Sequence, residues 1–135
     1  MPGRREITRL IIGMITGAVL VATGAIHSVF GWPAVSTSFR ASGAPPELVQ
    51  GLAVPWHFAG MAMITFGVIA IALFAAAARG GAVSLFPVRL IAVAYVLFGL
   101  AGIVLIKADA TFLLFLVPGA LLLAGAGLTD RAAGP

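Results

Sequence analysis

Residues 10–31 read LIIGMITGAVLVATGAIHSVFG, a run of about 22 residues without a charged side chain, which is long enough to cross a bilayer as one helix. The run follows a basic leader that contains Arg4, Arg5 and Arg9. A cleavable signal peptide has an apolar core of only about 7–15 residues, followed by a small-residue cleavage site. We therefore predict that this segment is retained as a transmembrane helix.

The rest of the chain has the same apolar character. Of its 135 residues, 61% are hydrophobic and 9% are charged, and the mean hydropathy is +1.17. Soluble globular domains are about 45–50% apolar and about 25% charged, so the excess apolar surface is expected to face lipid. The composition predicts an integral membrane protein with no soluble domain. We attribute the net charge of +4 to membrane topology and expect no nucleic-acid partner.

Four apolar stretches divide the chain into one all-α domain over residues 1–135, a bundle of four transmembrane helices. The predicted spans cover about residues 10–31, 56–78, 87–106 and 110–129. Residues 32–54 are predicted to be a polar outer connection with one short interfacial helix at 47–53, opened by Pro45 and Pro46. Pro55 is expected to break or kink the chain before the second span. Residues 107–109 form a short turn in which Asp109 caps the last helix.

The distribution of Lys and Arg predicts how the bundle is oriented, because cytoplasmic loops of membrane proteins carry an excess of basic residues. Only Arg40 and Lys107 lie in the predicted outer connections. The predicted cytoplasmic side carries the larger set, which is Arg4, Arg5, Arg9, Arg79, Arg89 and Arg131. We expect both termini to be cytoplasmic, and the protein to be a multi-pass protein of a bacterial inner membrane.

Glycines recur at helical spacing in three of the four predicted spans. In a membrane, small residues let helix backbones approach closely, so a glycine face most often marks a helix contact. A ligand lying in the grooves is the alternative interpretation. The candidate packing residues are Gly13, Gly17, Gly24, Gly60, Gly67, Gly99 and Gly102.

The two histidines, His27 and His57, lie near the outer ends of the first two predicted spans. If these helices are antiparallel neighbours, the imidazoles lie at similar depth and can approach. Two imidazoles can ligate a haem iron, and Met61, one turn beyond His57, would suit Cu(I). Alternatively, each histidine bonds a backbone carbonyl, Ser28, Tyr95 or interfacial water. A proton-linked or quinone-type site is a third interpretation.

The segments around these histidines, residues 24–31 (GAIHSVFG) and Trp56-His57, resemble a pattern found in small, uncharacterised four-span bacterial membrane proteins. The resemblance covers the outer ends of the first two predicted helices. It implies a four-helix inner-membrane protein, and it carries no established activity.

For function we carry two classes. The first is a noncatalytic accessory or scaffold subunit that packs through its glycine-rich faces, either with other membrane subunits or as a homo-oligomer. The second is a haem- or metal-binding electron-transfer protein that uses His27 and His57. A small transporter or channel comes third, because no charged pathway crosses the predicted bilayer region. The predicted spans contain no evident Ser/His/Asp set, which favours a protein that is not an enzyme.

Overall fold

The computed structural model describes residues 3–105 and 110–127, and these residues form helices joined by short turns. In chain order the elements are α1 (Arg4–Ile26), the π-helix η1 (His27–Gly31), α2 (Trp32–Ala41), α3 (Pro46–Ala78), α4 (Phe86–Leu105), the 3-10 turn η2 (Ala110–Phe112) and α5 (Leu113–Ala126). No strand occurs within the described ranges, so the predicted all-α fold class is confirmed. Among the described residues, three helical stretches are long and apolar enough to cross a membrane, and α5 is a shorter apolar helix.

The first helix continues well beyond its predicted end. The elements α1, η1 and α2 follow one another without a break and form a helical stretch of 38 residues, Arg4–Ala41. The prediction that the first helix ends at residue 31 was therefore wrong. In α2 the hydroxyls of Ser36 and Thr37 donate to the carbonyl of Pro33, and the hydroxyl of Ser38 donates to that of Ala34. Serine and threonine hydroxyls can bond within a helix in this way, so the polar sequence is compatible with a continuous helix here.

The π-helix η1 lies directly before Pro33, the second residue of α2. Proline lacks a backbone N–H, and in a regular α-helix its ring clashes with the carbonyl four residues earlier. A π-helical turn is wider than an α-helical one, and such turns usually occur as single insertions within α-helices. We attribute the π-helical turn to the need to pass Pro33 without ending the helix.

The short interfacial helix predicted at 47–53 is not a separate element. It forms the first part of α3, which begins at Pro46 and runs through Pro55 without a break. Pro55 removes one backbone donor, but packing against α2 keeps this part of the chain helical. Val49, for example, is only 1% exposed. The turn between α2 and α3 is therefore short, and Gly43 occupies the left-handed region in it with φ +80°.

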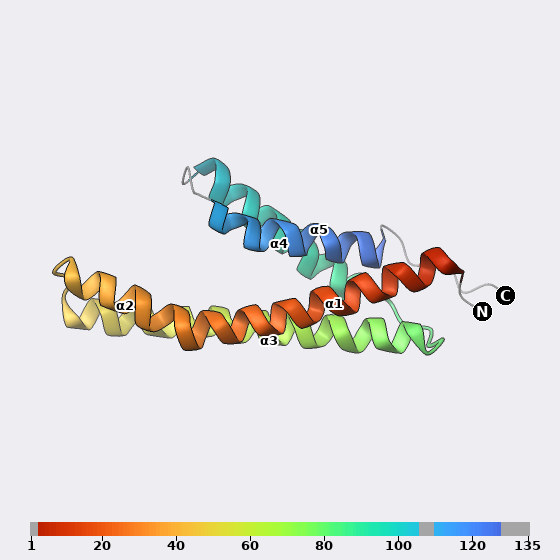
Figure 1. The fold of residues 1–135 in the computed structure, drawn as a ribbon, viewed down its shortest axis with the longest axis horizontal. Coiled ribbons are helices and arrows are strands. Elements are labelled where there is room, and N and C mark those ends of the chain that lie inside the picture. Colours follow the sequence, from red (N-terminus) through yellow and green to blue (C-terminus); the bar gives the residue numbers. More distant parts are fainter. Residues whose placement is uncertain (1–2, 106–109, 128–135) are drawn as a thin grey trace.

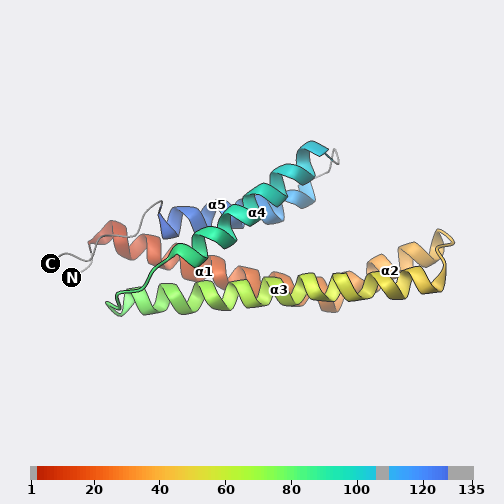
Figure 2. The same cartoon turned by 180° about the vertical axis from the view of Figure 1, so that it is seen from behind.

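The helices form two antiparallel hairpins of unequal length (Figures 1 and 2). The long hairpin consists of α1, η1, α2 and α3, and the short hairpin consists of α4, η2 and α5. The two hairpins lie together near the start of α1, where α5 packs against α1, and the short hairpin then diverges toward its turn (Figure 1). Within the described residues, η1 and α2 contact neither α4 nor α5.

The main core lies where the two hairpins meet. Phe74 of α3 is fully buried, and its ring fills the space beside Gly13 of α1 and Gly125 of α5. Tyr95 of α4 packs between Phe66 and Phe115, with ring centroids 6.4 and 5.8 Å away. The buried hydrophobic residues of this core are Leu10, Leu20, Met63, Ala70, Phe74, Val88, Ile91, Ala92, Tyr95, Leu122 and Ala126. The turn predicted at 107–109, with Asp109 as a helix cap, lies outside the described residues.

Candidate functional site

The glycines of the first two predicted spans lie in the contact between α1 and α3. A Cβ atom on Gly67 would lie 2.5 Å from the carbonyl oxygen of Gly17, and one on Gly24 would lie 2.6 Å from the carbonyl oxygen of Gly60. Real Cβ atoms do not come this close to other atoms, so the two backbones approach each other because these positions lack side chains. We call this contact, formed by Gly17, Gly24, Gly60 and Gly67, the glycine seam.

The other predicted packing glycines also lie at contacts inside the chain. Gly13 lies against the ring of Phe74. In α4, Gly99 lies against the backbone of Leu116, and Gly102 lies against the ring of Phe112. All seven candidate glycines are therefore used to assemble the two hairpins or to join them. They do not form a free face for another protein.

Two further packing glycines were missed in the sequence. Gly119 of α5 lies against the carbonyl oxygen of Ala92, and Gly125 lies against Phe74 and the backbone of α1. At about 100° of rotation per residue, a six-residue separation places them on different faces of α5, where they contact different neighbours. Recurrence at helical spacing was therefore the wrong signal for α5.

Four aromatic and imidazole rings gather at the π-helical turn, and we call them the ring cluster: His27, Trp32, Trp56 and His57. His27 stacks on Trp56 with a centroid distance of 4.1 Å and an interplanar angle of 8°. Trp32 lies 6.0 Å from Trp56 and meets His57 edge-on at 5.9 Å. The indole Nε1 of Trp56 also donates to the backbone carbonyl of His27, at 2.8 Å. The ring cluster thus joins α3 to the other arm of the long hairpin.

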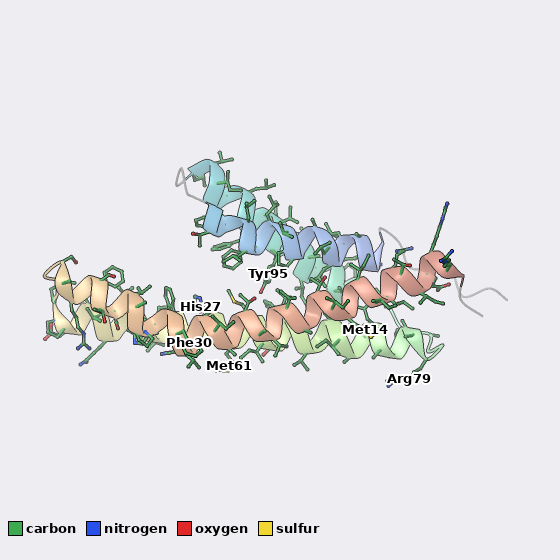
Figure 3. All side chains as sticks on the ribbon, in the orientation of Figure 1. Met14, His27, Phe30, Met61, Arg79 and Tyr95 are labelled. Atoms are coloured by element: carbon green, nitrogen blue, oxygen red, sulfur yellow. The ribbon has the colours of Figure 1, made fainter. Side chains whose placement is uncertain are left out.

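The three residues predicted as metal or haem ligands, His27, His57 and Met61, differ in exposure and do not all lie on the same edge of the hairpin. Each imidazole packs against an indole: His27 on Trp56, and His57 on Trp32. The Nε2 atom of His27 is enclosed by protein and has no hydrogen-bond partner among the described residues, whereas His57 is exposed. Met61 is 62% exposed, and Figure 3 shows it on the edge of the long hairpin opposite to His27. A shared ligand would therefore require these side chains to reorient.

Carboxylate ligands do not complete such a site. Within residues 3–105 and 110–127, no group of three or more His, Cys, Asp or Glu side chains is placed to hold a metal ion. The chemistry available at the cluster is therefore that of stacked aromatic rings, one enclosed imidazole nitrogen and one exposed imidazole. Such rings combine an apolar body with a polar edge.

A second polar contact, missed in the sequence, joins the hairpins at the opposite end of the molecule. Nε of Arg9 in α1 donates to the backbone carbonyl of Ala124, in the last turn of α5, at 3.3 Å. The guanidinium group also lies beside Gly127, which follows the end of α5 with φ +69°. Basic side chains stabilise helix C-termini, where backbone carbonyls are left without partners.

The basic side chains that the structure describes gather mostly at this same end of the molecule. Arg4, Arg5 and Arg9 lie in the first turns of α1, and Arg79 follows the end of the antiparallel helix α3 at the same end (Figure 3). Arg89 lies one turn into α4, which starts near this end.

Comparison with protein-family models, with curated proteins and with solved structures finds no match for this chain.

Proposed function

We propose that the chain is a noncatalytic accessory or scaffold subunit of a larger membrane complex, inserted in a bacterial inner membrane with both termini in the cytoplasm. Insertion is supported by the three helical stretches of sufficient length and hydropathy. The orientation is supported by the basic residues that gather at the end where α1 begins, since positive charge favours the cytoplasmic side.

The observation that carries this proposal is the uncovered outer part of the long hairpin. Neither η1 nor α2 contacts the short hairpin, and the adjoining part of α3 exposes large apolar side chains. Phe30 is 71% exposed and Phe58 is 70% exposed. Exposed apolar side chains also occur on α4, where they are expected to face lipid, so this region is distinguished by the lack of contact with the short hairpin. Because the glycine seam is already used within the chain, the partner would pack against this part of the long hairpin instead. This differs from the sequence-based expectation of docking through glycine-rich faces.

Site-specific photocrosslinking in the native membrane tests the proposal. A benzophenone amino acid would replace Phe30 or Phe58, followed by gentle solubilisation and purification of the adducts. Phe86, which is 55% exposed at the other end of the molecule, is the matched control. We expect an adduct with a different polypeptide from Phe30 and Phe58, and none from Phe86. Adducts with lipid alone, or with a second copy of this chain, would contradict an accessory role.

A haem- or metal-binding electron-transfer protein is the second candidate. It is favoured by the gathering of His27 and His57 in one ring cluster and by the Nε2 atom of His27, which has no hydrogen-bond partner among the described residues. The test is an absorption spectrum, oxidised and then reduced, of protein purified from its native membrane. A Soret band that shifts on reduction, and that is lost in His27→Ala and His57→Ala, would support this candidate. A featureless spectrum would remove haem.

A further inference from the structure

The helices of the long hairpin are longer than a bilayer is thick, whereas α4 of the short hairpin matches the bilayer. At 1.5 Å per residue, the 38 residues of Arg4–Ala41 span about 57 Å, and the 33 residues of α3 span about 50 Å. The 20 residues of α4 span about 30 Å, which equals the thickness of a typical hydrocarbon core. The helix α4 thus has the length of the hydrocarbon core, and the two arms of the long hairpin exceed it by about 20–27 Å.

Most of the excess length lies at one end, because the hairpins are joined near the other, where α1 extends only a short way beyond the contact with α5 (Figure 1). Arg9 contacts the last turn of α5, and Phe74 contacts Gly125. Counted from Arg9, one hydrocarbon thickness of about 30 Å corresponds to about 20 residues and ends near Val29, inside η1. The ring cluster therefore lies where the outer edge of the core is expected, and residues 32–55 lie beyond it.

The side chains agree with this division. Trp prefers the headgroup level of a bilayer, where its ring is in an apolar region and its N–H is near water. Beyond the cluster, the exposed residues of the long hairpin include the charged side chains Arg40 and Glu47. Ionised groups are costly in hydrocarbon unless they are paired or can reach the interface.

We propose that the ring cluster binds the headgroup layer of the outer leaflet, and that residues 32–55 stand out of the membrane as a stiff helical hairpin. The cluster fixes the depth of insertion because it ties both arms of the long hairpin together at one level. The segment beyond it continues the membrane helices into water for about 15 Å, given the 10 residues of α2. This differs from a short helix lying flat on the membrane surface, which the sequence suggested.

Tryptophan fluorescence tests the depth of the cluster directly, because Trp32 and Trp56 are the only two tryptophans in the chain. The full-length protein would be reconstituted in phosphatidylcholine vesicles whose acyl chains carry bromine either near the headgroup or near the chain end. We expect the greatest quenching from bromine near the headgroup. Greatest quenching from bromine at the chain ends, or none from either lipid, would overturn the proposed depth.

Cysteine labelling tests the hairpin, because the chain contains no cysteine. Ser38→Cys and Ser42→Cys would be reacted with a charged maleimide present on both sides of the vesicle membrane, and Val68→Cys would be the control within the membrane. We expect full labelling at residues 38 and 42 and no labelling at residue 68. Nitroxides on the consecutive α2 positions 36, 37 and 38 distinguish the upright hairpin from a flat helix. In an upright hairpin all three nitroxides are accessible to a water-soluble relaxing agent. If their accessibility alternated between water-soluble and lipid-soluble agents, the helix would lie flat and the upright hairpin would be overturned.

This inference depends on the membrane insertion stated in the proposed function, but not on a partner. Labelling of Val68→Cys in vesicles would refute insertion itself, and with it both proposals. Protected Val68→Cys together with protected Ser38→Cys and Ser42→Cys would refute only the projecting hairpin. Failure to find a partner by crosslinking leaves the expected depth and labelling pattern unchanged.

Discussion

Both hairpins contain close backbone contacts at glycines, but the contact at Gly67 in the long hairpin differs in kind from the one at Gly102 in the short hairpin. In the long hairpin, Gly17 and Gly67 place the two backbones against each other, and no side chain intervenes at this point. In the short hairpin, the ring of Phe112 fills the notch at Gly102, and the aromatic rings of Phe98 and Phe115 meet edge to face nearby with a centroid distance of 4.8 Å. A backbone contact cannot adjust to an added atom, whereas a side chain can rotate. We therefore expect the contact at Gly67 to tolerate an added atom less well than the contact at Gly102.

The largest expected effect lies at the junction of the hairpins. Phe74→Ala would leave a cavity beside Gly13 and Gly125, and a buried Phe→Ala change costs about 3–5 kcal/mol of unfolding free energy. Phe86→Ala is the matched control, because that ring is 55% exposed. Unfolding in detergent micelles, followed by circular dichroism, measures both. Equal stability of the two variants would show that the hairpins do not depend on this junction.

The second prediction compares the two kinds of glycine contact directly. Gly67→Ala places a Cβ atom 2.5 Å from the carbonyl oxygen of Gly17, so the helices must part, and we expect a loss of about 2 kcal/mol. Gly102→Ala meets the ring of Phe112 instead, and a rotation of that ring should reduce the loss to about 1 kcal/mol or less.

Gly51→Ala is the control for both variants, because nothing lies within 4 Å of a Cβ atom at this exposed helical position. Alanine favours helix over glycine by about 1 kcal/mol, so this change is expected to stabilise the protein. The same unfolding measurement applies to all three variants. A larger loss of stability for Gly102→Ala than for Gly67→Ala would contradict the expectation that the backbone contact is the less tolerant of the two.

The third prediction concerns the outer part of the long hairpin. Trp56→Phe keeps a ring beside His27 but removes the indole N–H that donates to the His27 carbonyl. We expect a loss of about 1 kcal/mol, the usual net value of one hydrogen bond. Trp32→Phe, which keeps an aromatic ring beside Trp56 and His57, is the comparison. If Trp32→Phe destabilised the protein as much as Trp56→Phe, ring size rather than the hydrogen bond would hold the cluster together.

Much of the helical fold follows from hydropathy, and its main error has a physical cause. Long apolar runs predicted helices, because a helix satisfies its own backbone groups wherever water is absent. The error lay at residues 32–55, where polar residues and prolines suggested a loop. Ser36 and Thr37 bond to their own helix, and Pro33 is passed by a π-helical turn, so neither signal ended the helix. A polar composition indicates which residues are exposed to water, but it does not indicate where a helix ends.

The candidate site was only partly predictable, for a related reason. The positions of His27 and His57 near the outer ends of two antiparallel spans predicted a similar depth, but they gave no information on which ring each imidazole would contact. The contacts depend on the rotation of each helix about its axis, and that rotation is set by the glycine seam. The seam places Trp56 against His27 and leaves Met61 on the other edge of the hairpin (Figure 3). Which side chains meet across a hairpin can therefore be predicted only once the packing contact between its two helices is known.

The smallest expected effect lies at the polar contact between the hairpins. Arg9→Met keeps most of the side-chain length but removes the donor to the Ala124 carbonyl and the positive charge at the end of α5. Both contributions are modest at an exposed helix end, so we expect a loss of about 0.5–1 kcal/mol. Arg5→Met, at an exposed position of α1, is the control. Amide hydrogen exchange localises the effect: the last turn of α5 should exchange faster in Arg9→Met, while the glycine seam keeps its protection. Faster exchange along the whole long hairpin would instead mean that Arg9 supports α1 itself and not specifically its contact with α5.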